Sequence, residues 1–248
     1  MAIPQLFASA RDLIPLVNDR NIEFFELVKN NFDTETIKLL FIEAQCKGQL
    51  GIMKLLYRLK KDICDPGECF LYACAHGRLD IAQWLYLLDD GKINIHAHNE
   101  SAFIHSCQNG YLDIAQWLYA LDGKINIHAH NESTFIHSCQ NGYLDIAQWL
   151  YALDDKINSH VDNEAAFIYT CKNGHLNVAQ WLFALDDTNI HADNEAAFIY
   201  SCQNRHLDIA KWLYALNYET DIRAFVDQSF KYSCEQGHLE IAKWLCTL

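Results

Sequence analysis

The chain has 248 residues, 51% of them apolar, and its 32 acidic against 19 basic residues leave a formal net charge of -13. Such a charge repels nucleic-acid backbones and anionic lipid surfaces, so we expect neither as a partner. The sequence shows no basic leader, no run of about 18 apolar residues and no low-complexity stretch, so we expect an ordered, soluble protein.

The first 66 residues contain two segments, 22–28 and 50–56, with the same apolar pattern. Each segment resembles the second helix of the helix pairs that recur later in the chain. We therefore predict two divergent helix pairs in residues 1–66. They would cap the amino-terminal end, with polar outer-face candidates at Arg11, Asp12, Asp19 and Arg20. Asp65-Pro66-Gly67 is expected to form a turn between units.

Residues 67–248 repeat one phrase around a tryptophan, at positions 84, 117, 149, 181, 212 and 244, so successive tryptophans lie 31 to 33 residues apart. A fixed period of this size indicates a stacked solenoid, in which each unit buries its apolar face against its neighbours. In residues 112–121 (LDIAQWLYAL) the apolar spacing predicts a helix. We predict that the tryptophans are core residues, each worth about 3 to 5 kcal/mol.

Each repeat unit is predicted to contain two short helices, for example residues 103–109 and 112–121, followed by a polar stretch over 122–131. Asn109-Gly110 and its equivalents end the first helix, because the residue after the helix needs a positive φ that glycine adopts readily. Arg205 replaces this glycine and should be locally strained. Carboxylates are expected in the first turn of the second helix, where they face the positive end of the helix dipole: Asp113, Asp145, Asp208 and Glu240.

Six of the ten cysteines occupy one position of the repeat: Cys74, Cys107, Cys139, Cys171, Cys202 and Cys234. Equivalent atoms of stacked helices lie roughly 8 to 10 Å apart, which exceeds the Cα separation of about 7 Å that a disulfide allows. We therefore expect buried, reduced thiols and a reducing compartment.

The turn phrases Gly174-His175-Leu176 and Gly237-His238-Leu239-Glu240 resemble those of the ankyrin repeat family. The resemblance covers nearly the whole chain and implies an all-α solenoid of about eight helix-turn-helix units with short or degenerate hairpin fingers. It assigns two capping units to residues 1–66 and six tandem repeats to 67–248. The start of each repeat departs from the family pattern, because Ser133-Thr134-Phe135-Ile136 stands where Thr-Pro-Leu-His is usual. The glycine that is usual in the hairpin is also missing. The combination of IAQWLYAL with INIHAHNE is similar to ankyrin repeats of giant amoeba-infecting viruses (mimivirus-like).

Ankyrin domains usually bind partners on their concave side, and the resemblance implies two rows of partner-binding residues here. The row before the helix-ending glycine contains Gln108, Asn109, Gln140, Asn141, Lys172, Asn173, Gln203 and Asn204. The hairpin row contains His98, Asn99, Glu100, His130, Asn131, Glu132, Asp162, Asn163, Glu164, Asp193, Asn194 and Glu195. The four glutamates would form an evenly spaced acidic ladder for a partner with Lys or Arg, although a solvated edge explains them equally well.

Two adjacent repeats are nearly identical, since residues 92–121 and 124–153 differ only at Ala102 against Thr134. Residues that bind an irregular protein surface should diverge first. Either the duplication is recent and the two units act as spacers, or they bind a partner that is itself repetitive or extended.

The histidines offer an alternative function. Its first form is a metal site, but alternate residues of an extended strand point to opposite faces, so His128 and His130 would not normally share one ion. Equivalent histidines such as His128 and His160 lie roughly 8 to 10 Å apart, one repeat from each other, which is also too far, so we expect no bound metal and no cofactor. The second form is a hydroxylase substrate. In the ankyrin family, asparaginyl hydroxylase often modifies a hairpin asparagine, and this chain has a histidine at the equivalent positions: His96, His128, His160 and His191. No phosphate loop or nucleophile motif is present, so we do not expect an enzyme.

These observations predict a nonenzymatic protein-interaction scaffold. A viral origin implies a host protein as partner and the host cytoplasm as location. A substrate adaptor for host ubiquitin ligase machinery is the alternative, although no F-box-like segment follows Leu248. The abrupt stop after Trp244-Leu245-Cys246, shielded only by Lys231 and Lys243, also predicts a partly apolar carboxy-terminal face, so the protein is expected to be a monomer or weakly self-associating.

Overall fold

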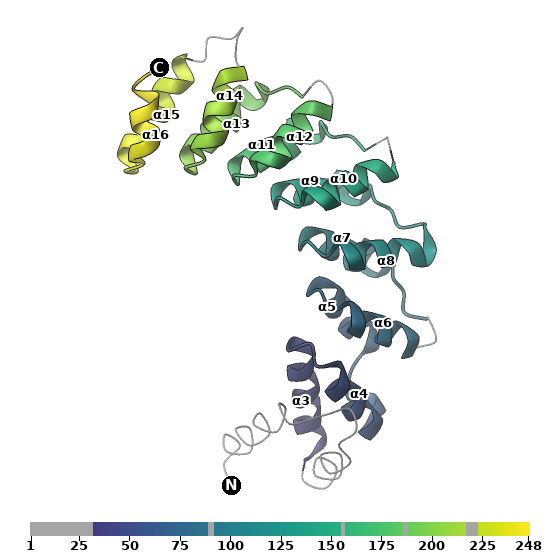
Figure 1. Ribbon diagram of the computed structural model, residues 1–248. Helices are drawn as coiled ribbons and strands as arrows, with labels where there is room; N and C mark the ends of the chain where they lie inside the picture. Colours follow the sequence, from purple (N-terminus) through teal and green to yellow (C-terminus); the bar gives the residue numbers. More distant parts are fainter. Residues whose placement is uncertain (1–31, 89–91, 155–156, 186–187, 217–222) are drawn as a thin grey trace, which may run out of the picture. The chain divides into compact units, whose positions relative to one another are not determined.

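The computed structural model describes residues 32–88, 92–154, 157–185, 188–216 and 223–248. These residues form fourteen α-helices and no β-strand, which confirms the predicted all-α solenoid (Figure 1). By its contacts the chain divides into an amino-terminal part, up to residue 106, and a carboxy-terminal part, residues 107–248. None of the described helices has the length and apolar character needed to cross a membrane. The helix expected over residues 22–28 and its four polar capping candidates lie outside the described residues.

The amino-terminal part contains α3 (Thr34–Cys46), α4 (Leu50–Leu59), the 3-10 helix η2 (Lys61–Ile63), α5 (Pro66–Ala75), α6 (Leu79–Leu88) and the start of α7 (Ala97–Gln108). Helix α3 begins at Asp33, whose Oδ1 accepts a hydrogen bond from the Thr36 amide at 2.8 Å. Helix α4 packs against α3 as the pattern over 50–56 predicts, and α6 packs against α5. Phe41, Met53 and Leu56 are fully buried between these elements.

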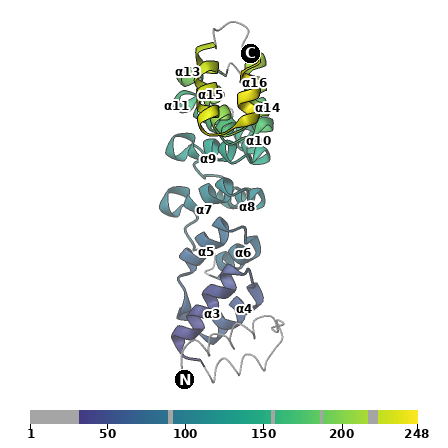
Figure 2. The same ribbon diagram turned by 90° about the vertical axis from the view of Figure 1, so that its left-hand side faces the viewer.

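The carboxy-terminal part continues with α8 (Leu112–Asp122), α9 (Ala129–Gln140), α10 (Leu144–Leu153), α11 (Val161–Lys172), α12 (Leu176–Leu185), α13 (Ala192–Gln203), α14 (Leu207–Leu216), α15 (Arg223–Glu235) and α16 (Leu239–Leu245). Helix α11 packs between α9 and α13, and α15 packs on α13. Figure 2 shows the resulting two layers, with α9, α11 and α13 on one side and α10, α14 and α16 on the other. Each first helix is therefore covered by its own second helix and by the first helices of its neighbours.

The turns between paired helices have the backbone that the sequence predicts. Gly110, Gly142 and Gly174 adopt φ values of 85°, 79° and 86°. A Cβ at Gly142 would lie 2.4 Å from the ring of His175 in the next unit, so this position excludes a side chain for steric reasons as well. Arg205 takes the same place with φ 69°, which confirms the expected strain, because a residue with a Cβ is disfavoured in this region.

A phenylalanine, rather than the tryptophan, is the most buried aromatic residue of the repeat. Phe70, Phe103, Phe135, Phe167 and Phe198 are at most 2% exposed, whereas all six tryptophans are half-buried. Trp181 packs across the unit boundary, edge-on against the Tyr151 ring at 6.0 Å and near the Phe135 ring at 6.2 Å. The prediction of a packing role for tryptophan is thus correct, but the prediction of a fully buried core position is wrong. The indole packs at the boundary between two units and stays partly exposed.

The cysteines are all free, as predicted. Five of the six repeat cysteines are buried, and the sixth, Cys234, is exposed. Burial raises the pKa of the Cys74 and Cys202 thiols to about 12, so both remain protonated near neutral pH. They act as small apolar side chains within the stack.

Candidate functional site

The candidate interaction surface is built on a left-handed turn that opens the first helix in four repeat units. In α9 the residues His130, Asn131 and Glu132 have φ values of 54°, 57° and 60°. The same conformation occurs over residues 98–100, 162–164 and 193–195. A residue with a Cβ costs roughly 1 to 2 kcal/mol in this region, so three in succession require tertiary contacts that hold them.

Each left-handed turn is closed by a hydrogen-bonded histidine and glutamate, which we call the His–Glu pair. The histidine Nδ1 lies 2.6 to 2.9 Å from a glutamate Oε1 in the four pairs His96–Glu100, His128–Glu132, His160–Glu164 and His191–Glu195. An asparagine two residues earlier accepts a hydrogen bond from the histidine amide with its Oδ1, at 3.0 to 3.1 Å. These contacts hold the turn at both of its ends. The Glu164 carboxylate also accepts a hydrogen bond from the backbone amide of Asn189, in the next unit, at 3.2 Å.

The expectation that the four glutamates form an exposed acidic ladder is wrong. Their exposed fractions are 6%, 7%, 6% and 4% for Glu100, Glu132, Glu164 and Glu195. The left-handed turn directs each carboxylate inward beneath its histidine, where a buried charge requires hydrogen-bond donors. A signal in the sequence could have indicated this, because Asn-x-His-x-x-x-Glu recurs at 94–100, 126–132, 158–164 and 189–195.

The residues that the turns do expose are the two that precede each glutamate. Those of the carboxy-terminal part, which we call the finger surface, are His130, Asn131, Asp162, Asn163, Asp193 and Asn194, and His98 and Asn99 are exposed in the same way in the amino-terminal part. All eight were predicted as partner-binding residues, and that role stays a prediction. Within the surface, Asn131 Nδ2 donates to Asp162 Oδ1 at 3.1 Å, so two successive fingers share a hydrogen bond. The fingers therefore expose hydrogen-bonding side chains on a backbone that the His–Glu pairs hold in place.

The second predicted row, before the helix-ending glycine, is partly used to join repeat units. Asn141 Nδ2 donates to the backbone carbonyl of Gln108, and Asn173 Nδ2 donates to the backbone carbonyl of Gln140, both at 2.8 Å. In the next unit, where Arg205 replaces glycine, Asn204 Nδ2 donates instead to Tyr200 O of its own helix at 2.9 Å. The other members of this row are Asn109, Lys172 and Gln203, and the Lys172 Nζ lies 5.3 Å from the centre of the Tyr200 ring. The Gln108 side chain also lies in hydrogen-bond contact with His137, at 3.1 Å from Nε2 to Nδ1. At least four of the seven carboxamide side chains in this row thus have a structural hydrogen bond beside any role in binding.

One His–Glu pair shows a clear electrostatic effect. The hydrogen bond to Glu132 raises the pKa of His128 above its ordinary value, and Asp154, whose Oδ2 lies 3.3 Å from the His128 Nε2, adds to the effect against the opposing influence of burial. Partial burial lowers the pKa of His175, with the neighbouring His206 acting in the same direction. Across the described ranges, no group of three or more His, Cys, Asp or Glu side chains could hold a metal ion.

Comparison with known families supports the repeat architecture. The family model described as "Ankyrin repeats (3 copies)" matches residues 24–131, 70–161 and 135–225. These ranges overlap and together run from residue 24 to residue 225, which is well over half of the 248-residue chain. No curated protein matches the sequence.

Proposed function

The chain belongs to the ankyrin repeat family, and on this basis we propose that it is a nonenzymatic scaffold that binds another protein through the finger surface. Ankyrin repeats are generally protein-interaction modules. The observation that carries the proposal is the row of exposed side chains on left-handed turns, each fixed by a buried glutamate that is hydrogen-bonded to a half-buried histidine. A surface that is already ordered loses little conformational entropy on binding. Because the His–Glu pairs order the turns, they support a binding role for the exposed residues of the finger surface.

The chemistry of the finger surface indicates what the partner presents. In the carboxy-terminal part the fingers expose His130, Asn131, Asp162, Asn163, Asp193 and Asn194. These side chains offer amide, imidazole and carboxylate groups but few apolar atoms. A partner with hydrogen-bonding groups, and with Lys or Arg opposite the two aspartates, would complement them.

Affinity capture with a turn-preserving variant tests this proposal. Changing Asn131, Asn163 and Asn194 together to glycine removes three finger side chains while glycine keeps the positive φ. A matched control changes Gln148, Asn177 and Lys211 to alanine, because these residues are exposed on the second helices α10, α12 and α14. We expect the finger variant to lose the captured partner and the control to keep it. Retention of the partner by the finger variant would place the interface elsewhere.

The resemblance to ankyrin repeats of giant amoeba-infecting viruses supports a further part of the proposal, in which the protein is viral and its partner is a host protein in the host cytoplasm. The ten free cysteines are consistent with a reducing compartment. Capture from amoebal lysate and imaging of the tagged protein in amoebae test the partner and the location separately.

Two alternatives give distinct outcomes in the same preparation. A substrate adaptor would bring ubiquitin ligase subunits into the captured material together with a client. A hydroxylase substrate would show one added oxygen per modified histidine in the intact mass. The half-buried ring of His160, with Nδ1 bonded to Glu164, is the group such an enzyme would have to reach.

Weak self-association through α15 and α16 is a separate part of the proposal. Phe230 and Cys234 are exposed there, whereas the equivalent Phe198 and Cys202 of the preceding unit are buried. Leu239 is 66% exposed in the same unit. Sedimentation over a range of concentrations should show a rising average mass, and Leu239→Glu should suppress it. A constant monomer mass would contradict this part.

A further inference from the structure

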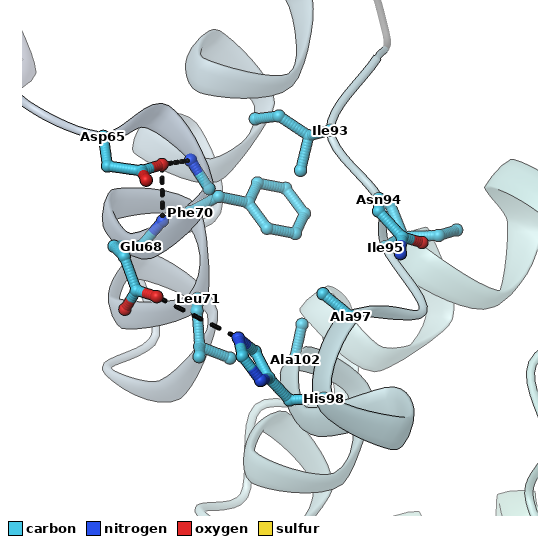
Figure 3. Close-up of a pocket in the computed structure, with 11 residues that line it drawn as sticks. Asp65, Glu68, Phe70, Leu71, Ile93, Asn94, Ile95, Ala97, His98 and Ala102 are labelled. Atoms are coloured by element: carbon cyan, nitrogen blue, oxygen red, sulfur yellow. Dashed lines mark hydrogen bonds and ion pairs between the residues drawn. The ribbon is translucent and has the colours of Figure 1, made fainter.

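A cavity of about 220 Å³ lies in the amino-terminal part, between the start of α5 and the segment that leads into α7 (Figure 3). Apolar side chains line its interior, among them Phe70, Ile93 and Ile95, and polar residues such as Glu68 and Asn94 complete the lining. Figure 3 shows the Phe70 ring and the Ile93 side chain pointing into the space, with Glu68 at its edge. The cavity thus combines an apolar interior with an acidic rim.

The opening of α5 explains why this unit contains a cavity. Alignment on the phenylalanine of the first helix places Gly67 where the next unit has Glu100, and Ile63 where it has His96. Helix α5 therefore has no His–Glu pair. It begins instead as an ordinary helix capped by Asp65, whose Oδ1 accepts from the Gly67 amide at 2.8 Å. No side chain at position 67 extends toward residues 93–95.

A later unit shows what fills the equivalent space elsewhere. There the Glu164 carboxylate reaches the segment of the following unit and accepts from the Asn189 amide. Asn94 is the equivalent of Asn189, two residues before the histidine of its unit, and it lines the cavity at α5. The cavity is therefore a place where this repeat architecture accommodates a polar side chain from a neighbouring element.

The charge around the cavity determines which side chain fits. The Glu68 side chain is 69% exposed, and its ion-pair contact with His98 Nε2, at 3.9 Å, is longer than a hydrogen bond. Acidic residues at a helix start need no ligand to explain them, since they face the positive end of the dipole. The apolar cavity beside Glu68 is the additional feature. An acidic ligand would be repelled there, whereas a long basic side chain can lay its aliphatic part on apolar walls and place its charge on a carboxylate.

We propose that this cavity binds the side chain of an arginine or lysine presented by a partner protein, with its aliphatic part against Phe70, Ile93 and Ile95 and its charged group on Glu68. The proposal rests on the proposed interaction function and names one chemical feature of the partner. It adds a site at α5 that is separate from the hydrogen-bonding side chains of the turns in the carboxy-terminal part. The net charge of -13 favours the approach of such a basic partner.

Small-molecule titration of the full chain tests the site without a known partner. The probes are N-acetyl-arginine amide, N-acetyl-lysine amide and N-acetyl-citrulline amide, since citrulline keeps the shape of arginine without the charge. Methyl NMR signals of Ile93 and Ile95 report binding. We expect saturable shifts with the arginine and lysine probes, and weaker binding of citrulline by up to about fivefold, which is the upper limit for an exposed ion pair. Added salt should weaken only the charged probes.

Two matched variants identify the carboxylate that is involved. Glu68→Gln should reduce arginine binding to the level of citrulline. Glu35→Gln removes the same charge from the exposed first turn of another helix, α3, and should leave binding unchanged. Both sites are exposed, so the unliganded methyl spectra should show an intact fold. Equal binding of arginine and citrulline, no shift at the isoleucine methyls, or an equal effect of both variants would overturn the proposal. None of these results bears on the finger surface, whose failure would appear in the capture experiment.

Discussion

Replacing Glu164 with alanine should destabilise the protein by about 2 kcal/mol. The Glu164 Oε1 accepts from His160 Nδ1 at 2.8 Å and from the Asn189 amide at 3.2 Å. A net hydrogen bond contributes roughly 0.5 to 1.5 kcal/mol, and one to a charged group about 1.5 to 3 kcal/mol. The full sum is not expected, because the freed groups of His160 and Asn189 are both near the surface and can bond to water. The left-handed backbone contributes nothing to the difference, since both side chains have a Cβ.

A glutamine at the same position separates the acceptor from the charge. Glu164→Gln keeps the side-chain volume and a carbonyl oxygen that can accept both hydrogen bonds, so we expect a loss of less than about 1 kcal/mol. Urea unfolding followed by far-UV circular dichroism measures the free energy of both variants. Because a solenoid can unfold in steps, hydrogen exchange at the Asn189 amide supplies a local measurement, which should accelerate in the alanine variant and change little in the glutamine variant.

Two results would refute this reasoning. If the alanine variant unfolds within about 0.5 kcal/mol of the unmodified protein and Asn189 exchanges as before, the His–Glu pair does not hold the turn. If the glutamine variant loses as much stability as the alanine variant, the negative charge, and not the hydrogen-bond acceptor, maintains the turn.

The remaining predictions concern the backbone, the core and pH. Arg205→Gly should raise the unfolding free energy by about 1 kcal/mol in thermal denaturation, because glycine relieves the positive φ; an equal gain with alanine would show another cause. Phe167→Ala should cost about 3 to 5 kcal/mol and more than Trp181→Ala, because only the phenylalanine is fully buried; chemical denaturation showing the opposite order would contradict the assignment of the core. The raised pKa of His128 means that its pairing with Glu132 stabilises the fold fully below the unfolded pKa of about 6.5, and that this contribution disappears as pH rises through the folded value. The stability lost by His128→Gln should therefore be larger at about pH 5.5 than at about pH 8, and an equal loss at both would contradict the raised pKa.

The sequence alone determined the repeat and the position of its helices. Periodic tryptophans, helix-ending glycines and first-turn carboxylates are local signals, because each depends on the backbone preferences of a few neighbouring residues. The strain at Arg205 could be predicted for the same reason, since its φ follows from the turn that the other units share. The free cysteines also followed from spacing alone.

Tertiary structure decided which side of each finger is buried. A polar run such as His130-Asn131-Glu132 resembles a solvated loop, and the usual backbone preferences disfavour three consecutive residues with positive φ. The His128–Glu132 contact itself is local, because the two residues lie four apart in the sequence. The contact that the sequence does not show is the one between units, in which the Glu164 carboxylate accepts a hydrogen bond from the Asn189 backbone amide. The burial of phenylalanine over tryptophan has a similar origin. Sequence shows which residues are apolar, but the contact between neighbouring units determines how deeply each one is covered.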